Sequence, residues 1–225
     1  FVACDTSNID LVKKIIKETK TNELEIIPKF GLQFFYSKYG RKFLENFNKD
    51  FFLDLKINDI KQTALSAIDS LKDLKKCKYI TVHANGGLEM LKAVKKRAKK
   101  TNKNLKVLGV TILTSLNNKS LKEIGHTKNL GQLVLKQVNL IKKAGLHGVV
   151  LSAKEANMIK KKYKNLFVVT PGIRFPGDKM DDQVRVVTPY EALKKNNVNA
   201  IVMGRSLIRG NIKNNIKKLI DHLNK

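Results

Sequence analysis

The sequence has few of the features that mark secreted, fibrous or membrane proteins. Two cysteines in 225 residues are too few for a disulfide scaffold or a cysteine-rich metal site. The 13 glycines and 4 prolines exclude a collagen-like or low-complexity chain. No apolar run approaches the ~20 residues of a membrane-spanning helix, and the first residues lack the basic segment and cleavage pattern of a secretory signal. We therefore expect a cytoplasmic protein without a membrane partner.

The length of the chain suits one sizeable hydrophobic core. We expect a single domain over residues 1–225, with two small domains as the alternative. Because the sequence begins with Phe1 rather than Met, we also expect that a few residues before it are missing.

Acidic residues are scarce as well. The sequence has 19 of them and 45 lysines and arginines, so the formal net charge is +26. Such an excess raises the hypothesis of a nucleic-acid-binding protein. However, only six of the basic residues are arginines and 21 residues are asparagines, a composition that an AT-rich coding sequence produces. The lysines lie mainly in helical patterns, where they form an ordinary solvated face. We therefore expect no nucleic-acid partner, although the charge should attract anionic ligands such as phosphates.

Short apolar runs alternate with longer amphipathic stretches along the chain. The runs start about every 28 residues on average, close to the ~30 residues of a βαβ unit. Eight such units predict an α/β fold, a single (β/α)8 TIM barrel, with an open doubly wound sheet as the alternative. The last helical pattern, residues 206–220, is interpreted as one helix. The predicted strands are 1–5, 25–30, 51–56, 79–84, 106–113, 148–153, 166–173 and 200–205.

Nearly every predicted strand ends in a polar or charged residue. In this kind of barrel the catalytic groups lie at the carboxyl ends of the strands, and phosphate binds after strands 7 and 8. For the histidine among these residues, a packed or hydrogen-bonded role is favoured over that of a catalytic base. The residues and segments at the predicted rim are Asp5, Lys29, Asp54, Lys56, His83, Thr114, 171–174 and 204–206.

The most informative motif is DLKINDI at residues 54–60. Because side chains alternate along a strand, Asp54 and Lys56 are predicted to point to the same side, into the barrel mouth. Asp59 follows just past the strand end, and Lys29 comes from the neighbouring strand. These residues predict an alternating array of positive and negative charges. A salt-bridge network that only stabilises the barrel top is the alternative, and we favour chemistry.

A second motif combines Arg174 in PGIR with Arg205 in MGRS. A strand that runs into Gly-Arg-Ser and then a helix offers backbone N–H groups and a positive helix end to an anion. An arginine there adds bidentate hydrogen bonds to phosphate oxygens. The polar stretch 175–187 is predicted to be a lid over the phosphate, with Gln183 reaching the ligand. For GRS alone, a plain helix start is the alternative.

Together these motifs resemble those of the orotidine 5′-monophosphate decarboxylase family, from Phe1 to the last predicted helix. The D-x-K-x-x-D element is shared by a wider superfamily, whereas its combination with LTS, PGIR and DDQ is specific. Pro28 departs from the family pattern and removes a hydrogen-bond donor from the strand pairing. The matching segments are ACD (3–5), KFGLQFF (29–35), FLDLKINDI (52–60), VHANGG (82–87), VTILTS (110–115), TPGIR (170–174), DDQ (181–183) and MGR (203–205).

The resemblance implies the reaction, which is conversion of orotidine 5′-monophosphate to UMP and CO2 in de novo pyrimidine biosynthesis. It implies that Lys29 contacts ribose and joins the charge array, that Asp54 sits against the substrate carboxylate and that Lys56 supplies a proton. Asp59 would enter from the second subunit of a homodimer with shared active sites. The other implied binding residues are Asp5 at the ribose hydroxyls, Ile60 and Thr63 beside Asp59, Thr114 at the pyrimidine, Gln183 between base and phosphate, and Arg174, Gly204 and Arg205 at the phosphate.

We expect neither a cofactor nor a metal, because the sequence has no G-x-G-x-x-G, P-loop or H-E-x-x-H motif. Loss of CO2 from C6 of orotate leaves a carbanion that no adjacent carbonyl delocalises, so electrostatic stabilisation and protonation by Lys56 must suffice. The alternative is a sugar-phosphate enzyme of the superfamily, such as the Mg²⁺-dependent 3-keto-gulonate-6-phosphate decarboxylase. Such enzymes resemble this chain in D-x-K-x-x-D but carry an acidic residue in place of Lys29. A lysine at this position would repel a divalent ion, which disfavours this alternative.

Overall fold

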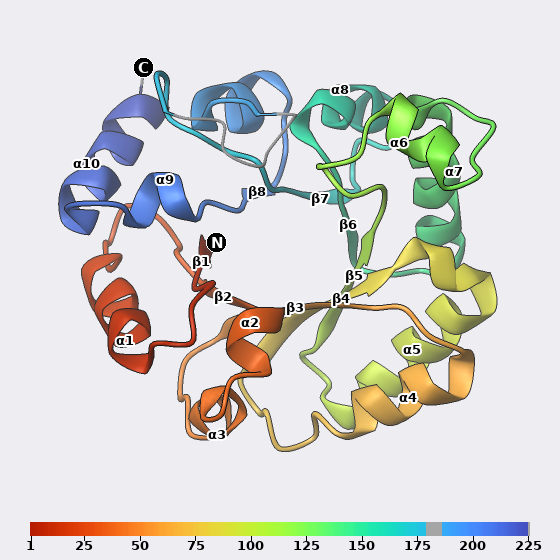
Figure 1. Cartoon of the computed structure of the whole chain (residues 1–225), viewed down its shortest axis with the longest axis horizontal. Helices are drawn as coiled ribbons and strands as arrows, with labels where there is room; N and C mark the ends of the chain where they lie inside the picture. The colour runs from red at the N-terminus through yellow and green to blue at the C-terminus, as the bar shows by residue number, and fades with distance from the viewer. Residues whose placement is uncertain (179–185, 225) are drawn as a thin grey trace.

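A computed structural model describes residues 1–178 and 186–224 of the chain, and within them eight parallel strands pair in sequence order. Figure 1 shows the strands around a common centre with the helices outside them. A parallel bridge between Val2 and Met203, with a 2.8 Å hydrogen bond from the Ala3 N–H to the Met203 carbonyl, joins the last strand to the first. The predicted (β/α)8 barrel is confirmed. The strands are β1 (Val2–Ala3), β2 (Pro28–Gly31), β3 (Phe51–Ile57), β4 (Cys77–His83), β5 (Lys106–Val110), β6 (Gly148–Val150), β7 (Phe167–Thr170) and β8 (Ala200–Ile201).

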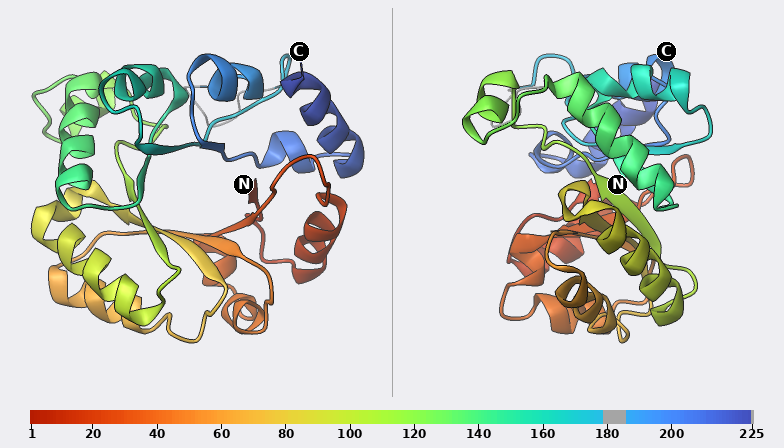
Figure 2. Two further views of the ribbon diagram at one scale, coloured as in Figure 1. Left: turned by 180° about the vertical axis from the view of Figure 1, so that it is seen from behind. Right: turned by 90° about the vertical axis from the view of Figure 1, so that its right-hand side faces the viewer.

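Helices connect successive strands and cover the outside of the barrel, as the left view of Figure 2 shows. Figure 1 also shows that the last helix lies beside the first, which brings the two ends of the chain's helical layer together. The helical elements are α1 (Ile9–Glu18), α2 (Leu32–Phe35), α3 (Gly40–Glu45), α4 (Lys61–Asp69), η1 (Ala84–Gly86), α5 (Gly87–Thr101), α6 (Asn118–Glu123), α7 (Leu130–Lys143), α8 (Ala153–Lys162), η2 (Glu191–Lys195), α9 (Arg205–Ile208) and α10 (Ile212–Leu223).

The amphipathic pattern explains how a helix such as α1 forms and packs. The Asn8 side chain caps its amino end by accepting the N–H groups of Asp10 and Leu11 at 2.9 and 3.0 Å. Val12 and Ile15 are fully buried against the barrel, while the lysines of the same helix face solvent. No helix in the described parts of the chain is both long and apolar enough to cross a bilayer.

The single helix predicted for residues 206–220 is wrong, because the structure has two helices there. Gly210 separates them in the left-handed region with φ of 70°, which a glycine adopts without steric cost. Asn211 then caps α10 by accepting the Asn214 N–H at 3.0 Å. Several strands are also shorter than predicted, such as β5, which ends at Val110.

Pro28 does not disturb the strand pairing. It is the first residue of β2 and lies opposite Val2, a position where a missing N–H is tolerated. The following residue, Lys29, pairs with Ala3 on one side and Phe52 on the other. The lysine side chain is therefore fixed in the barrel wall by regular pairing on both sides.

The core has two parts, one between the strands and the surrounding helices and one inside the barrel. Ile27, Phe52, Tyr79, Leu108 and Val169 form the interior cluster and are at most 8% exposed. These residues precede the polar strand ends, so the interior changes from apolar to charged along the direction of the strands. The charged end is the carboxyl rim, where Asp5, Lys29, Asp54 and Lys56 lie.

Candidate active site

Four side chains, three from β2 and β3 and one just after β1, form a continuous chain of ion pairs at the carboxyl rim. The Lys29 Nζ lies 3.1 Å from Asp5 Oδ1 and 3.5 Å from Asp54 Oδ2. The Lys56 Nζ lies 2.9 Å from the same Asp54 Oδ2. Charges of opposite sign therefore alternate from Asp5 through Lys29 and Asp54 to Lys56. The array that forms within this chain includes Asp5 and leaves out the predicted Asp59.

The inner two members of this array are almost removed from solvent, whereas the outer two are accessible. The side chains of Lys29 and Asp54 are 7% and 14% exposed, and those of Asp5 and Lys56 are 56% and 35% exposed. The array thus presents one carboxylate and one ammonium group to any ligand that enters from the rim.

Burial and charge act in opposite directions on the two inner groups. Burial alone would raise the pKa of the Asp54 carboxyl, but the charges of Lys29 and Lys56 and hydrogen bonds from Lys56 and Thr81 lower it below its ordinary value. Burial alone would lower the pKa of Lys29, but the carboxylates of Asp54 and Asp5 raise it. Both groups are therefore held in their charged forms at neutral pH.

The strand that carries Asp54 and Lys56 is irregular where these residues lie. The register of β3 on β4 shifts between Leu53 and Ile57. Lys56 has a φ of 51°, in the left-handed region that residues other than glycine seldom adopt. Asp54 and Lys56 do meet, as predicted, but through a bulge and not through simple alternation along a regular strand.

The array lines a cavity of about 610 Å³ at the carboxyl end of the barrel. Phe52, Val150 and Val202 contribute apolar surface from the barrel interior. Opposite the array, the cavity is lined by residues from the loops after β5, β7 and β8, which include Thr114, Arg174, Gly204 and Arg205. One wall of the cavity, from the first strands, therefore carries alternating carboxylate and ammonium groups. The opposite wall, from the last strands, is cationic.

The two arginines of the cationic wall come from neighbouring segments that contact each other. Arg174 is 8% exposed and donates from Nη1 to the Ile173 carbonyl at 3.0 Å. Arg205 is the first residue of α9, directly after Gly204. Ser206 links the segments, since its Oγ accepts the Phe175 N–H at 3.2 Å and donates to the Asp178 carboxylate. This brings PGIR and MGRS to the same end of the cavity.

Three predicted residues lie outside this cavity. Asp59 is exposed, and its Oδ1 accepts the N–H of the next residue, Ile60, at 2.7 Å. Asp59 and Thr63 line a separate depression of about 430 Å³ with Tyr36, and Lys56 borders both spaces. Ile60 is 74% exposed.

The predicted lid falls mainly outside the part of the chain that the structure describes. Gln183 and the rest of the DDQ segment lie among residues 179–185. The ends of the lid are described: Arg174 donates its N–H to the Val187 carbonyl, and Ile173 bridges to Val187 in parallel. His83, also at the rim, accepts the Asn85 N–H at 3.2 Å through Nδ1, so the prediction of a hydrogen-bonded histidine is confirmed.

Two residues of the site were missed in the sequence. Thr81 in YITVHA is fully buried and contacts both Asp54 and Lys56, and a polar residue inside an apolar strand was the available signal. Gly31 lies against the array, where a Cβ atom would come within 2.9 Å of Asp5 Oδ1. Its position at the end of β2 gave no sign of this close approach.

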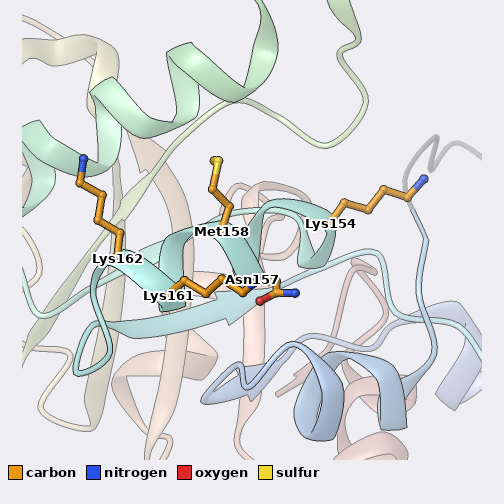
Figure 3. Close-up of a pocket in the computed structure, with 5 residues that line it drawn as sticks. All are labelled: Lys154, Asn157, Met158, Lys161 and Lys162. Atoms are coloured by element: carbon orange, nitrogen blue, oxygen red, sulfur yellow. The ribbon is translucent and has the colours of Figure 1, made fainter.

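Another depression, on the outer surface of α8, does not have the features of a binding site. Figure 3 shows Lys154, Asn157, Met158, Lys161 and Lys162 along the helix, with Lys154 and Lys162 extending toward opposite ends. Because these ammonium groups diverge, they do not converge on one ligand as the rim side chains do.

Comparisons with known proteins give the family to which the chain is similar. The model of the orotidine 5′-phosphate decarboxylase / HUMPS family matches residues 1–217. The chain is 40% identical over 216 residues to orotidine 5′-phosphate decarboxylase of Carboxydothermus hydrogenoformans, covering 92% of this chain and 88% of that protein. It is 37% identical over 212 residues to the Staphylococcus epidermidis protein of the same name, covering 92% and 90%.

Solved structures give the same result for the whole barrel. Orotidine 5′-phosphate decarboxylase from Lactobacillus acidophilus superimposes with a TM-score of 0.81 and 27% identity, covering 100% of this chain and 98% of that one. The enzyme from Methanocaldococcus jannaschii, solved in complex with the inhibitor BMP, superimposes with a TM-score of 0.74 and 26% identity, covering 100% and 97%.

Proposed function

Because the chain belongs to the orotidine 5′-phosphate decarboxylase / HUMPS family and is a carboxy-lyase, we propose that it converts orotidine 5′-monophosphate to UMP and CO2. The observation that carries this proposal is the Asp5–Lys29–Asp54–Lys56 array, which lines the same cavity as the arginines after β7 and β8. The product places the enzyme in pyrimidine biosynthesis. The barrel of residues 1–225 is then one catalytic domain.

Lys56 is the group that acts on the reacting carbon. Its ammonium stabilises the negative charge that develops at C6 as CO2 leaves, and then delivers a proton to that carbon. Asp54 holds this ammonium at 2.9 Å and faces the substrate carboxylate, so that their repulsion is relieved when CO2 departs. Two unit charges ~4 Å apart interact by about 4 kcal/mol at an effective dielectric constant near 20, or roughly three decades of rate.

One lysine therefore cannot supply the whole rate enhancement of such a reaction, and binding of the remote phosphate supplies part of the rest. Arg174, Gly204 and Arg205 hold the phosphate at the cationic wall of the cavity. Asp5 and Lys29 bind the ribose hydroxyls, Thr114 contacts the pyrimidine, and the lid residue Gln183 bridges base and phosphate. Closing the lid over the phosphate excludes water and strengthens the electrostatic interactions at C6.

The position of Lys29 argues against the Mg²⁺-dependent alternative. Its ammonium lies between the carboxylates of Asp5 and Asp54, the two acidic groups that a divalent ion in this cavity would use. Both carboxylates are thus neutralised by a side chain that is almost fully buried. A metal ion would have to displace a lysine whose pKa is raised by the same two carboxylates.

The test is to follow the absorbance of orotidine 5′-monophosphate with the purified protein after exhaustive EDTA treatment, and to identify UMP as the product. We expect full turnover without added metal. Activity that disappears with EDTA and returns with Mg²⁺, or turnover of 3-keto-gulonate 6-phosphate in its place, would assign the protein to the sugar-phosphate branch.

The active enzyme is a homodimer in which Asp59 of one chain completes the site of the other. Large apolar side chains are exposed next to Asp59, since Tyr36 is 76% and Ile60 74% exposed, and Leu32 on the same side as Tyr36 is 47% exposed. Exposed apolar side chains that lie together are typical of an interaction surface. Lys56 borders both the catalytic cavity and the depression that holds Asp59 and Thr63, so a second chain seated there would approach the array.

Mixing two inactive variants tests the shared site. In a mixed dimer of Lys56→Ala and Asp59→Ala chains, one site carries both defects and the other carries neither. Random exchange gives about half mixed dimers, so roughly a quarter of the wild-type activity should return. If mixing restores nothing although subunit exchange is confirmed, Asp59 acts within its own chain.

A cytoplasmic location fits the two buried free thiols, Cys4 and Cys77.

A further inference from the structure

We propose that Thr81 is a positioning residue for the decarboxylation, because its hydroxyl fixes both the carboxylate of Asp54 and the backbone of Lys56. The inference rests on the proposed function, since it assigns Thr81 a role through the two residues placed at the reacting carbon. Thr81 lies on β4, belongs to no motif used above and is fully buried.

The first observation is the mismatch between β3 and β4. Leu53 pairs with Ile80 and Ile57 pairs with Val82, so three residues of β3 lie opposite the single residue Thr81. Such a bulge disrupts the ladder of backbone hydrogen bonds and redirects side chains, and bulges are frequent next to active sites. The residues within this bulge are 54–56, which include both members of the central ion pair.

The second observation is that the Thr81 side chain takes the place of the missing ladder partner. The Lys56 N–H donates to Thr81 Oγ1 at 2.9 Å, and Lys56 has the left-handed φ of 51°. A lysine does not keep this conformation without support, because its Cβ crowds the backbone there. The hydroxyl oxygen is therefore one of the contacts that hold the backbone of Lys56 in a strained geometry.

The third observation concerns the direction of the hydroxyl proton. Because Thr81 Oγ1 accepts from Lys56, its own O–H is free to donate to Asp54 Oδ1, at 2.8 Å. The other oxygen of Asp54, Oδ2, forms ion pairs with both lysines. It lies 2.9 Å from Lys56 Nζ and 3.5 Å from Lys29 Nζ. The hydroxyl thus sets the rotation of the carboxylate and assigns one oxygen to the two ammonium groups.

Removing the hydroxyl should therefore release both halves of the ion pair at once. The carboxylate of Asp54 could rotate, and the backbone of Lys56 could relax, which would move its Nζ away from C6. Positioning errors of this kind reduce the rate of the chemical step more than they reduce ground-state binding. UMP has no carboxylate group at C6, so its affinity should depend little on the change.

The test compares Thr81→Val, which removes the hydroxyl at nearly constant volume, with Thr81→Ser, which keeps it. We expect Thr81→Val to lower kcat for orotidine 5′-monophosphate by about 10- to 100-fold, the size of a lost hydrogen bond to a charged group. The Kd of UMP should change less than about twofold, and Thr81→Ser should restore most of kcat. If Thr81→Val does not fold, Thr81→Ala takes its place in the comparison with Thr81→Ser.

The matched control is Thr111→Val, at the position directly after β5. Thr111 is also fully buried, and its hydroxyl donates to the Val150 carbonyl at 3.2 Å without touching the array. Its loss should lower stability and leave kcat near the wild-type value. Equal kcat in Thr81→Val and Thr81→Ser, or an equal loss in Thr111→Val, would overturn the positioning role.

A crystal structure of Thr81→Val separates failure of this inference from failure of the proposed function. We expect Lys56 to lose its positive φ or the Asp54 carboxylate to rotate, whatever the substrate is. If both keep their wild-type geometry, Thr81 does not position them. If wild-type protein fails to decarboxylate orotidine 5′-monophosphate but the geometry does change, the proposed function is wrong and Thr81 still positions the pair.

Discussion

The interior of the barrel has two levels that differ in chemistry, in regularity and in purpose. At the first level, Phe52, Tyr79 and Leu108 pack against one another, and Phe52 and Tyr79 also pair in the ladder between β3 and β4. At the second level, two residues further along β3, Asp54 begins a bulge that contains a left-handed lysine. One strand thus changes from a packed apolar wall to a strained charged rim within two residues.

The difference shows how the fold can hold a costly site. Buried charges and positive φ values are unfavourable, and they persist only where the surrounding structure determines them. Here the apolar level below fixes the strands, and the buried hydroxyl of Thr81 fixes the bulge. We therefore expect mutations at the first level to change stability, and mutations at the second to change function.

The largest effect on stability should come from Leu108→Ala at the apolar level. Leu108 is fully buried in the interior cluster, so its truncation leaves a cavity and should cost about 2–5 kcal/mol of unfolding free energy. Urea unfolding measures this change, and kcat below the unfolding range should stay near the wild-type value. A large loss of kcat in folded Leu108→Ala protein would break the separation of the two levels.

A smaller free-energy change, in ligand binding and not in stability, is expected from Arg205→Ala on the cationic wall. Losing a charged hydrogen-bond donor to phosphate should weaken UMP binding by about 1.5–3 kcal/mol, and binding of uridine should be unchanged. Calorimetry with the two ligands measures the difference. Arg97→Ala is the control for loss of one positive charge, because Arg97 pairs with Asp69 on the helical layer. Equal losses for UMP and uridine would remove Arg205 from the phosphate site.

The smallest effect should be the pH dependence of stability that arises from Asp54. Burial alone would raise the pKa of Asp54, but the charges of Lys29 and Lys56 lower it below its ordinary value. Its stabilising contribution is therefore present above about pH 4, the ordinary value for an aspartate, and is lost as the pH falls through the native pKa. The stability difference between wild type and Asp54→Asn should shrink in acid.

Urea unfolding at pH 7 and pH 3 checks this sign. Glu23→Gln serves as the control, because Glu23 is exposed and should give a difference close to zero at both pH values. If the gap between wild type and Asp54→Asn widens in acid, the carboxylate is not stabilised by its lysines.

The fold could be predicted almost entirely from the sequence, because a barrel strand is an apolar run whose position periodicity reveals. All eight strands overlap their predicted ranges. The errors lie where local geometry decides, as at Gly210, which divides one amphipathic pattern into two helices. The ends of β5, β6, β7 and β8 were placed too late, whereas β2 and β3 each extend one residue beyond the predicted end.

The site could be predicted only in part, for physical reasons that differ between residues. Lys29, Asp54 and Lys56 came from motif and strand order, and the structure brings them together. Thr81 and Gly31 were missed because a hydrogen bond across a bulge and a close approach of backbone to carboxylate depend on three-dimensional contacts. The role proposed for Asp59 depends on how a second copy of the chain packs against the first, which sequence patterns do not specify.

The most direct test of the central claim is the reaction of Lys56→Ala, measured together with its affinity for UMP. Lys56 is 35% exposed and is not part of the apolar level, so the variant should fold and bind UMP with nearly the wild-type Kd. Its kcat for orotidine 5′-monophosphate should fall by about three decades or more, as expected for loss of the charge and proton at C6. Wild-type kcat in this variant, or equal losses in kcat and in UMP affinity, would contradict the assignment of the chemistry to the charged rim.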